Sequence, residues 1–367
     1  MARVLLVNPP FYRLLGSHYN SNSLGIAYIA GNLNNHGHDA WLYNADYLDR
    51  RDFLALKRLF GQFHDYTRYF QDEGAEIWQE VVDKILAASP EWVGYTSYTA
   101  NIKAIDIISR KVKQVAPHIR QVIGGTHATL DKEILDKLRA IDYAVAREGE
   151  QAMLDLVEGK DPRTIHGVAS RNLLGFINHN GDADTLDCNV LPFPERRKFW
   201  HLTPEQMSTV DVSYMVTIRG CPYRCNYCAS PYSWKRNKVQ FRTPDSVLAE
   251  MHHLKEHHWD TRKECDYTAS ANTSSKDMLV IPDNTIVYFV DDVFTVRKPR
   301  VIEILERMIS EGLNMPWKCE ARTDHLTPEI CGLMAQAGCT RVKLGFESGS
   351  DRILKQIQKD ETGADML

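Results

Sequence analysis

The sequence lacks several features that mark specialised classes of protein. Its eight cysteines among 367 residues are too few for a secreted scaffold stapled by disulfides. No apolar stretch approaches the roughly 18 residues of a membrane helix, and the run Met1–Val7 ends at Pro9 and Pro10, too short for a signal-peptide core. A basic excess is also missing, because 44 Lys and Arg face 48 Asp and Glu. These absences predict a cytoplasmic protein with no membrane span, no nucleic-acid partner and a small-molecule substrate.

What the sequence does contain is ordinary globular material. Hydrophobic residues make up 43% of the chain and charged residues 25%, with 21 Gly and 15 Pro. This composition excludes a disordered or collagen-like chain and provides enough apolar material for sizeable cores. With a typical domain of about 150 residues, the length predicts two domains.

Residues 1–165 alternate short apolar runs, typical of buried strands, with segments whose apolar residues recur every three or four positions, typical of helices. The strands are predicted at Val4–Asn8, Ala40–Asn44, Trp92–Thr96, Gln121–Gly124 and Tyr143–Ala146. The helices are predicted at Leu24–Asn34, Ile77–Ala88, Ile102–Val115 and Lys132–Leu138. This alternation predicts an α/β fold with a doubly wound, Rossmann-like parallel sheet. Because such sheets bind ligands beyond the carboxyl ends of their strands, we expect a site in the loops Pro9–Ser23, Ser97–Asn101 and Gly125–Thr129.

Residues 166–205 break this pattern. A small hairpin is predicted over Gly167–Gly181, and the following stretch contains Pro192 and Pro194, which suits an interdomain linker.

A second alternating series occupies residues 206–367. Strands are predicted at Met215–Ile218, Ile286–Val290, Trp317–Ala321 and Arg341–Phe346. Helices are predicted at Pro244–His257, Arg300–Glu311, Pro328–Ala337 and Arg352–Gln358. Four βα units in a row predict a βα (TIM-like) barrel. A complete eight-stranded barrel needs about 250 residues, so we expect a partial barrel, truncated at its C-terminus. The polar stretch Cys265–Asp283 is predicted to be a surface insertion without chemistry.

The strongest chemical signal is the spacing of Cys221, Cys225 and Cys228, directly after a predicted strand. Spacings of three and two residues let a short loop wrap three thiolates around one face of an iron–sulfur cubane and leave the fourth iron open. Two alternatives stay open at this point: a zinc site completed by a distant ligand, and a cluster fully ligated by a fourth cysteine. The remaining cysteines are not paired in sequence, and we interpret them as small buried hydrophobic residues. They are Cys188, Cys265, Cys319, Cys331 and Cys339.

The C-x3-C-x2-C pattern, with the aromatic Tyr227 before its last cysteine, resembles the signature of the radical S-adenosylmethionine (SAM) superfamily. The resemblance implies that Cys221, Cys225 and Cys228 hold a [4Fe–4S] cluster whose open iron is chelated by SAM. It also implies that an external one-electron reductant, such as flavodoxin or ferredoxin, triggers cleavage of SAM to methionine and a 5′-deoxyadenosyl radical.

Polar residues at later strand ends agree with this resemblance. Asp291 and Asp292 resemble the Asp-Asp variant of the segment that binds the SAM ammonium group. Glu347 and Ser348 resemble the segment that holds the ribose, and Arg322 is a candidate partner for a carboxylate. The alternative for each is a solvated charge at a strand end or a helix cap.

Four segments of the first domain resemble the cobalamin-binding domain that precedes the barrel in one radical SAM subgroup. They are Asn8–Pro10, Ser23–Tyr28, Gly124–His127 and Arg147–Glu150. Gly124 and Gly125 would let backbone approach a ligand closely, and Ser97 and Thr99 add hydroxyl groups one strand away. The residues implied to bind cobalamin are Ser97, Thr99, Gly124, Gly125, Thr126 and His127.

One departure concerns the cobalt atom. The Asp-x-His-x-x-Gly motif that ligates cobalt in many cobalamin domains is absent, which leaves the lower axial ligand open. His18 and His127 are candidates, although surface histidines or histidines at a ligand's edge are the simpler interpretation.

The resemblance as a whole predicts a cobalamin-dependent radical SAM enzyme, most simply a methyltransferase that acts on an unactivated carbon. Two alternatives remain. One keeps the cofactors but performs ring formation, rearrangement or oxidation. The other is a non-catalytic sensor module that binds cobalamin or the cluster.

Overall fold

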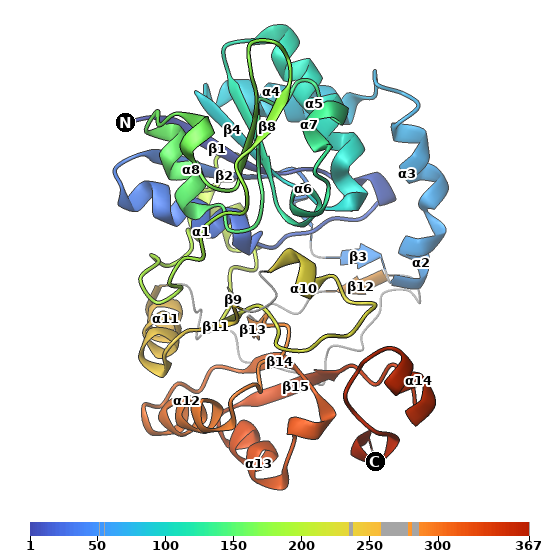
Figure 1. Ribbon diagram of the computed structural model, residues 1–367, viewed down its shortest axis with the longest axis vertical. Coiled ribbons are helices and arrows are strands. Elements are labelled where there is room, and N and C mark those ends of the chain that lie inside the picture. Colours follow the sequence, from blue (N-terminus) through green and yellow to red (C-terminus); the bar gives the residue numbers. More distant parts are fainter. Residues whose placement is uncertain (51, 55, 235–237, 258–277, 281–285, 367) are drawn as a thin grey trace. The chain divides into compact units, whose positions relative to one another are not determined.

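In the computed structural model, the described residues are 1–50, 52–54, 56–234, 238–257, 278–280 and 286–366. They form two compact units (Figure 1). The first contains residues 1–186, 191–211 and 278–280, and the second contains the described parts of 187–190, 212–257 and 286–366. Most of the predicted insertion Cys265–Asp283 lies outside the described residues.

The first unit is built on a seven-stranded sheet with the order β2-β1-β4-β5-β6-β7-β8. Its strands are β1 (Arg3–Asn8), β2 (Asp39–Asn44), β4 (Trp92–Thr96), β5 (Arg120–Gly124), β6 (Tyr143–Val145), β7 (Val168–Arg171) and β8 (Ile177–His179). The first five are parallel, and β7 and β8 add to them in antiparallel fashion. The chain thus reverses its direction of travel across the sheet between β1 and β4, which makes this the topological switch point of a doubly wound fold.

Helices cover both faces of this sheet (Figure 1). The helices of this unit are α1 (Leu24–Asn35), α2 (Leu56–Gly61), α3 (Phe63–Tyr69), α4 (Glu76–Ala87), α5 (Ile102–Val115), α6 (Thr126–Leu130), α7 (Ile134–Lys137), α8 (Glu150–Val157) and α9 (Pro204–Met207). Helices α4 and α5 pack together, as do α1 and α8. Because the sheet is covered on both sides, β4 is buried along its whole length. A short strand, β3 (Asp52–Leu54), pairs with β12 (Met278–Val280).

The predicted hairpin over Gly167–Gly181 is present as β7 and β8, but it extends the main sheet instead of standing apart. At the start of the hairpin, the backbone of Gly167 lies so close to Ala183 that an added Cβ would be 2.6 Å from the Ala183 Cβ. The φ of Gly167, +82°, also favours glycine.

The second unit is built on a four-stranded parallel sheet with the order β15-β14-β13-β9. Its strands are β9 (Tyr214–Met215), β13 (Val287–Phe289), β14 (Trp317–Ala321) and β15 (Cys339–Leu344). The helices are α10 (Ser230–Ser233), α11 (Pro244–His257), α12 (Lys298–Ser310), α13 (Pro328–Gln336) and α14 (Asp351–Gln356). Neighbouring strands follow one another in sequence order with helices between them, which is the connectivity of a βα barrel.

One predicted strand of this unit is wrong. Met215–Ile218 is not continuous, because the chain leaves β9 and forms β10 (Ile218–Arg219), which pairs with β11 (Gln240–Phe241). Side-chain bonds replace the sheet ladder at the break: the Val216 carbonyl accepts from Arg242 at 3.0 Å, and the Thr217 N–H donates to Asp291 at 2.6 Å.

Candidate cofactor sites

The loop after β10 brings Cys221, Cys225 and Cys228 together as half-buried free thiols. Gly220 begins the loop with φ +95°, a conformation that favours glycine. Asn226 fixes its middle, with its N–H bonded to the Ile357 carbonyl at 3.1 Å and its Nδ2 to the Gln356 carbonyl at 3.0 Å.

Burial raises the pKa of Cys221 to about 11, and the nearby Asp292, Cys228 and Cys225 add to the rise because their negative charges oppose a thiolate. A bound cation would remove this opposition, so the donor set suits a metal cluster. Among the described residues, no three His, Cys, Asp or Glu side chains converge on a point that fits a single metal ion.

The other described cysteines occupy mixed environments. Cys188 and Cys319 are buried as predicted. The prediction is wrong for Cys331, which is exposed, while Cys339 is half-buried. Cys265 lies outside the described residues.

The two neighbouring aspartates after β13 have different surroundings. Asp291 is only 1% exposed, and its carboxylate accepts from the Thr217 N–H at 2.6 Å, the Ile218 N–H at 2.9 Å and the Thr217 hydroxyl at 2.6 Å. Burial raises its pKa in spite of these bonds. Asp292 is exposed as a residue and accepts from the Ser230 hydroxyl, beside the cysteine loop, although partial burial of its carboxyl group raises its pKa as well. The sequence could not separate these two roles.

Arg322 is also engaged inside the protein. Its guanidinium forms two 3.0 Å bonds to Asp324 and stacks 3.7 Å from the ring centroid of Tyr223 in the cysteine loop. It also donates to the carbonyls of Lys359 and Asp360, at 2.7 and 2.8 Å. The carboxylate predicted for Arg322 is therefore supplied by its own chain.

Tyr227 and Glu347 lie near each other beside the cysteine loop, and burial together with the Glu347 carboxylate raises the pKa of Tyr227. Tyr227 is 51% exposed. Glu347 has φ +54°, an uncommon conformation for a residue other than glycine. Ser348 follows directly, and its hydroxyl accepts from the Ser350 N–H at 3.1 Å.

Sequence reasoning missed a hydrogen-bonded chain behind this loop. The Tyr223 hydroxyl bonds His325 at 2.5 Å, and the other ring nitrogen of His325 bonds the Thr295 hydroxyl at 3.0 Å. Tyr223 lies between two of the motif's cysteines, so its position within the motif was the available signal.

In the first unit, the six residues predicted to bind cobalamin lie at the carboxyl ends of β4 and β5 and in the segments that directly follow these strands. The Ser97 hydroxyl donates to the Gly124 carbonyl at 2.7 Å and accepts from the Ala128 N–H at 3.1 Å. Gly125 has φ +94°, and an added Cβ would lie 2.8 Å from the Ser97 nitrogen. The close approach that this glycine permits in the structure is thus to the chain's own backbone. Thr126 begins helix α6.

His127 is held between two side chains. One ring nitrogen bonds the Thr99 hydroxyl at 3.0 Å, and the other lies 3.5 Å from the Asp131 carboxylate. His18, the other candidate cobalt ligand, is only 5% exposed in the loop after β1. Neither histidine is presented as an open ligand.

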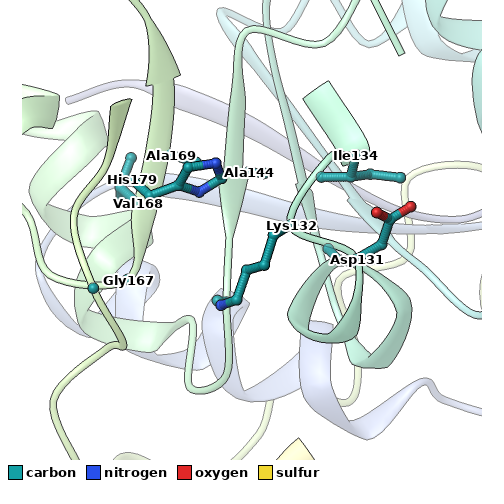
Figure 2. Close-up of a pocket in the computed structure, with 11 residues that line it drawn as sticks. Asp131, Lys132, Ile134, Ala144, Gly167, Val168, Ala169 and His179 are labelled. Atoms are coloured by element: carbon teal, nitrogen blue, oxygen red, sulfur yellow. The ribbon is translucent and has the colours of Figure 1, made fainter. Parts of the chain in front are cut away.

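A small cavity lies beside this region, lined by α6, the turn that follows it, β6, and the β7–β8 hairpin (Figure 2). Lys132 and Asp131 stand at its edge. Both have partners in the chain: Lys132 is 3.9 Å from Asp182, and Asp131 is 2.7 Å from Lys137. The rest of the lining is mostly small and apolar, so we assign the cavity no chemistry.

Comparison with known families identifies both halves of the chain. Residues 215–367 match the radical SAM superfamily. The fold and the cysteine loop thus define a radical SAM protein. Residues 16–157 match the B12-binding domain. The chain thus joins a B12-binding domain to a radical SAM domain, and the cofactors of these two domains are cobalamin, a [4Fe–4S] cluster and SAM.

Individual relatives are distant but extend along the chain. An uncharacterized methyltransferase of Pyrococcus horikoshii is 25% identical over 98% of this chain and 68% of its own length. The anaerobic magnesium-protoporphyrin IX monomethyl ester cyclase of Rubrivivax gelatinosus is 27% identical over 95% of this chain and 58% of its own length.

Solved structures show the same fold. The radical SAM methyltransferase TsrM of Kitasatospora setae has a TM-score of 0.69 at 15% identity, covering 100% of this chain and 64% of its own. The cobalamin-dependent SAM radical enzyme OxsB has a TM-score of 0.70 at 16% identity, covering 100% of this chain and 46% of its own. The chain therefore spans between about half and two thirds of the length of these relatives.

No helix in the described parts is long and apolar enough to cross a bilayer.

Proposed function

We propose that the protein is a radical SAM enzyme that transfers a methyl group to an unactivated carbon of a small molecule. The observation that carries the proposal is that Cys221, Cys225 and Cys228 share one loop, which lies beside Asp292 after strand β13 of the parallel sheet. The same chain also carries a B12-binding domain. When bound, the reduced cluster and cobalamin supply the electron that cleaves SAM and the methyl group that is transferred.

The chain's own residues divide into those that contact SAM and those that position the contacts. We assign Tyr227, Asp292, Glu347 and Ser348 to SAM. Tyr227 is an exposed residue of the cysteine loop, and the other three follow the ends of strands β13 and β15. Asp291 and Arg322 also belong to our predicted SAM set, but we assign them a positioning role without direct contact to SAM. Asp291 fixes the backbone before the loop, and Arg322 supports Tyr223 within it.

For cobalamin we propose Ser97, Thr99, Gly124, Gly125, Thr126 and His127. Their support is their position beyond the carboxyl ends of β4 and β5, beside the switch point where doubly wound sheets bind ligands. The proposed domain boundaries are 1–165 for this domain, 166–205 for the hairpin and linker, and 206–367 for the partial barrel.

We also propose the surroundings of the reaction. The substrate is a small molecule and not a nucleic acid, supported by the net charge of −4. The electron comes from an external flavodoxin or ferredoxin. The seven described cysteines are free thiols, which supports a reducing cytoplasm.

Ring formation is a second candidate, because one of the relatives reported above is named as a cyclase. Analysis of the product distinguishes the two reactions, since only methyl transfer moves a label from the SAM methyl group into the product.

The test is SAM cleavage by the chain after anaerobic reconstitution with iron, sulfide and hydroxocobalamin. We expect reduced protein to form 5′-deoxyadenosine. Cys225→Ala is expected to lose both the cluster iron and SAM cleavage, since a cubane retained by only two thiolates is not stably held. Cys331→Ala, an exposed cysteine of α13, is the matched control and should retain both. Full iron and full cleavage in Cys225→Ala would overturn the assignment of the cluster.

A further inference from the structure

The sheet of the second unit has a polar face that the proposed cofactor site does not use. The strand register pairs Tyr288 with Tyr214 on one side and Lys318 on the other, and Lys318 with Arg341. One row of polar side chains therefore crosses all four strands. Glu320 and Lys343 are paired two residues further along the same face. We call this set the polar face: Tyr214, Tyr288, Lys318, Glu320, Arg341 and Lys343.

The opposite face of the sheet is the core of the unit. Val287, Phe289, Trp317 and Cys319 alternate with polar-face residues and are at most 1% exposed, packed against residues of α12 and α13. Because side chains alternate along a strand, the polar face points away from these helices. In an ordinary βα barrel the corresponding interior is filled with branched apolar side chains. A polar interior is instead suited to water and a polar ligand, because burying a charge without a partner costs free energy.

The polar face carries three cations and one carboxylate. Glu320 is already engaged, accepting from the Tyr288 hydroxyl at 2.6 Å and from the Lys343 ammonium at 2.8 Å. The Lys318 ammonium lies 4.5 Å from the ring centroid of Tyr288. Arg341 is exposed, and the described part of the chain offers its guanidinium no ion pair or hydrogen bond. Positive charge is thus in excess, and a guanidinium is shaped to bind a carboxylate or phosphate with two bonds.

Two cations of the polar face, Lys318 and Arg341, are set back from the proposed SAM contacts. Lys318 and Arg341 each lie three residues before the end of their strand, at Ala321 and Leu344. At about 3.3 Å per residue, that is roughly 10 Å along the strand. Asp292 and Glu347 follow the strand ends, so a group bound at Arg341 belongs to a molecule that extends into the barrel.

We propose that the polar face anchors the substrate, with Arg341 and Lys343 binding an anionic group, either a carboxylate or a phosphate. The inference rests on the proposed function, because it names the substrate class of the same barrel. Lys343 serves both Glu320 and the anion, and Tyr288 holds Glu320 in place from the neighbouring strand.

The test is isothermal titration calorimetry of the reconstituted full chain at low ionic strength with two probes, glutarate and pyrophosphate. We expect at least one probe to bind saturably, and the tighter one identifies carboxylate or phosphate as the anchor. Arg341→Gln and Lys343→Gln should each raise its Kd about tenfold or more, since each removes a charge-assisted hydrogen bond. Arg341→Lys should recover part of the affinity, because lysine retains the positive charge but cannot form the two parallel hydrogen bonds of a guanidinium.

Arg352→Gln is the matched control, since Arg352 is an exposed arginine on α14 of the same unit, and its Kd should not change. Iron content should stay at the wild-type level in all these variants, which shows that the protein still folds and holds its cluster. No saturable binding of either probe, or an equal Kd in wild type and Arg341→Gln, would overturn the proposal. Wild-type protein that fails to cleave SAM would count against the proposed function, whereas anion binding is measured without turnover.

Discussion

Both units fix a loop with a buried aspartate placed just after a strand. In the first unit, Asp46 follows β2 and accepts from the backbone N–H groups of Phe11 and Arg13, at 2.8 and 3.0 Å. In the second unit, Asp291 follows β13 and accepts from the N–H groups of Thr217 and Ile218. Burial raises the pKa of each carboxyl, to about 6 for Asp46. The two units therefore use the same kind of buried aspartate to fix a loop. They differ in the groups that lie at the carboxyl edge of each sheet.

At the carboxyl edge of the sheet in the first unit, the polar groups of the two loops are hydrogen-bonded to each other. Ser97 bonds the loop after β5, and Gly125 packs against the Ser97 backbone. At the edge of the second unit, three thiols are gathered without a disulfide among them, and Cys221 has a raised pKa. The first edge is shaped before any ligand arrives, whereas the second gains its partners from a bound cluster. Among residues assigned to a cofactor, substitutions should consequently act through shape in the first unit and through cofactor chemistry in the second.

The largest effect is expected from Asp291→Asn. An amide cannot accept from all three donors, and it leaves the nearby Arg300 without its buried counter-charge. We expect the free energy of unfolding of the second unit to fall by about 3–4 kcal/mol, as when one partner of a buried charged network is removed. Urea unfolding of the chain measures it.

Asp292→Asn is the contrasting neighbour. Because Asp292 is exposed, we expect unfolding to change by less than about 0.5 kcal/mol, while SAM cleavage falls. Equal destabilisation by the two substitutions would contradict the division of roles.

The next effect tests shape in the first unit. Gly125→Ala places a Cβ 2.8 Å from the Ser97 nitrogen and 2.9 Å from its carbonyl oxygen, at φ +94°. We expect a loss of stability of about 2–3 kcal/mol from strain and overpacking. Cobalt retained after reconstitution should fall while iron is unchanged. Gly61→Ala, where nothing lies within 4 Å, is the control, and wild-type cobalt in Gly125→Ala would refute the assignment of this edge.

The smallest change in stability that we predict for a buried group concerns Asp46 and depends on pH. Its folded pKa of about 6 lies above the ordinary 3.8, so the folded state binds the proton more tightly. The resulting stability is fully present below about pH 4 and is lost as the pH rises through 6. Relative to Asp46→Asn, the wild-type chain should lose about 2 kcal/mol between pH 4 and pH 7.

Urea unfolding at four pH values in that range measures the difference. Asp83→Asn, at an exposed position of α4, should parallel the wild type throughout. Parallel curves for the wild type and Asp46→Asn would show that Asp46 is not the group responsible.

Hydrophobic patterning was sufficient for most of the fold. β4 and α5 match their predicted bounds, because each is a single buried run or stripe between clear breaks. The pattern failed at Met215–Ile218, where bonds from distant side chains replace strand pairing. It also missed α6, whose five residues are too few to show a helical period.

The candidate site was predictable in its ligand chemistry but not in its supporting contacts. The spacing of the three cysteines is local and visible in the sequence. The burial of Asp291 and the engagement of Arg322 depend on partners distant in the chain, such as Thr217 and Lys359. The polar face had a visible signal that we did not use, because Lys318 and Glu320 alternate with buried residues along β14.

The central claim is that one chain holds both an iron–sulfur cluster and cobalamin at the two strand edges compared above. The most direct measurement is the iron and cobalt content of the wild-type chain after anaerobic reconstitution and desalting, read together with its absorption spectrum. The account predicts about four irons and about one cobalt per chain. Iron without cobalt, or less than about one iron per chain, would contradict it.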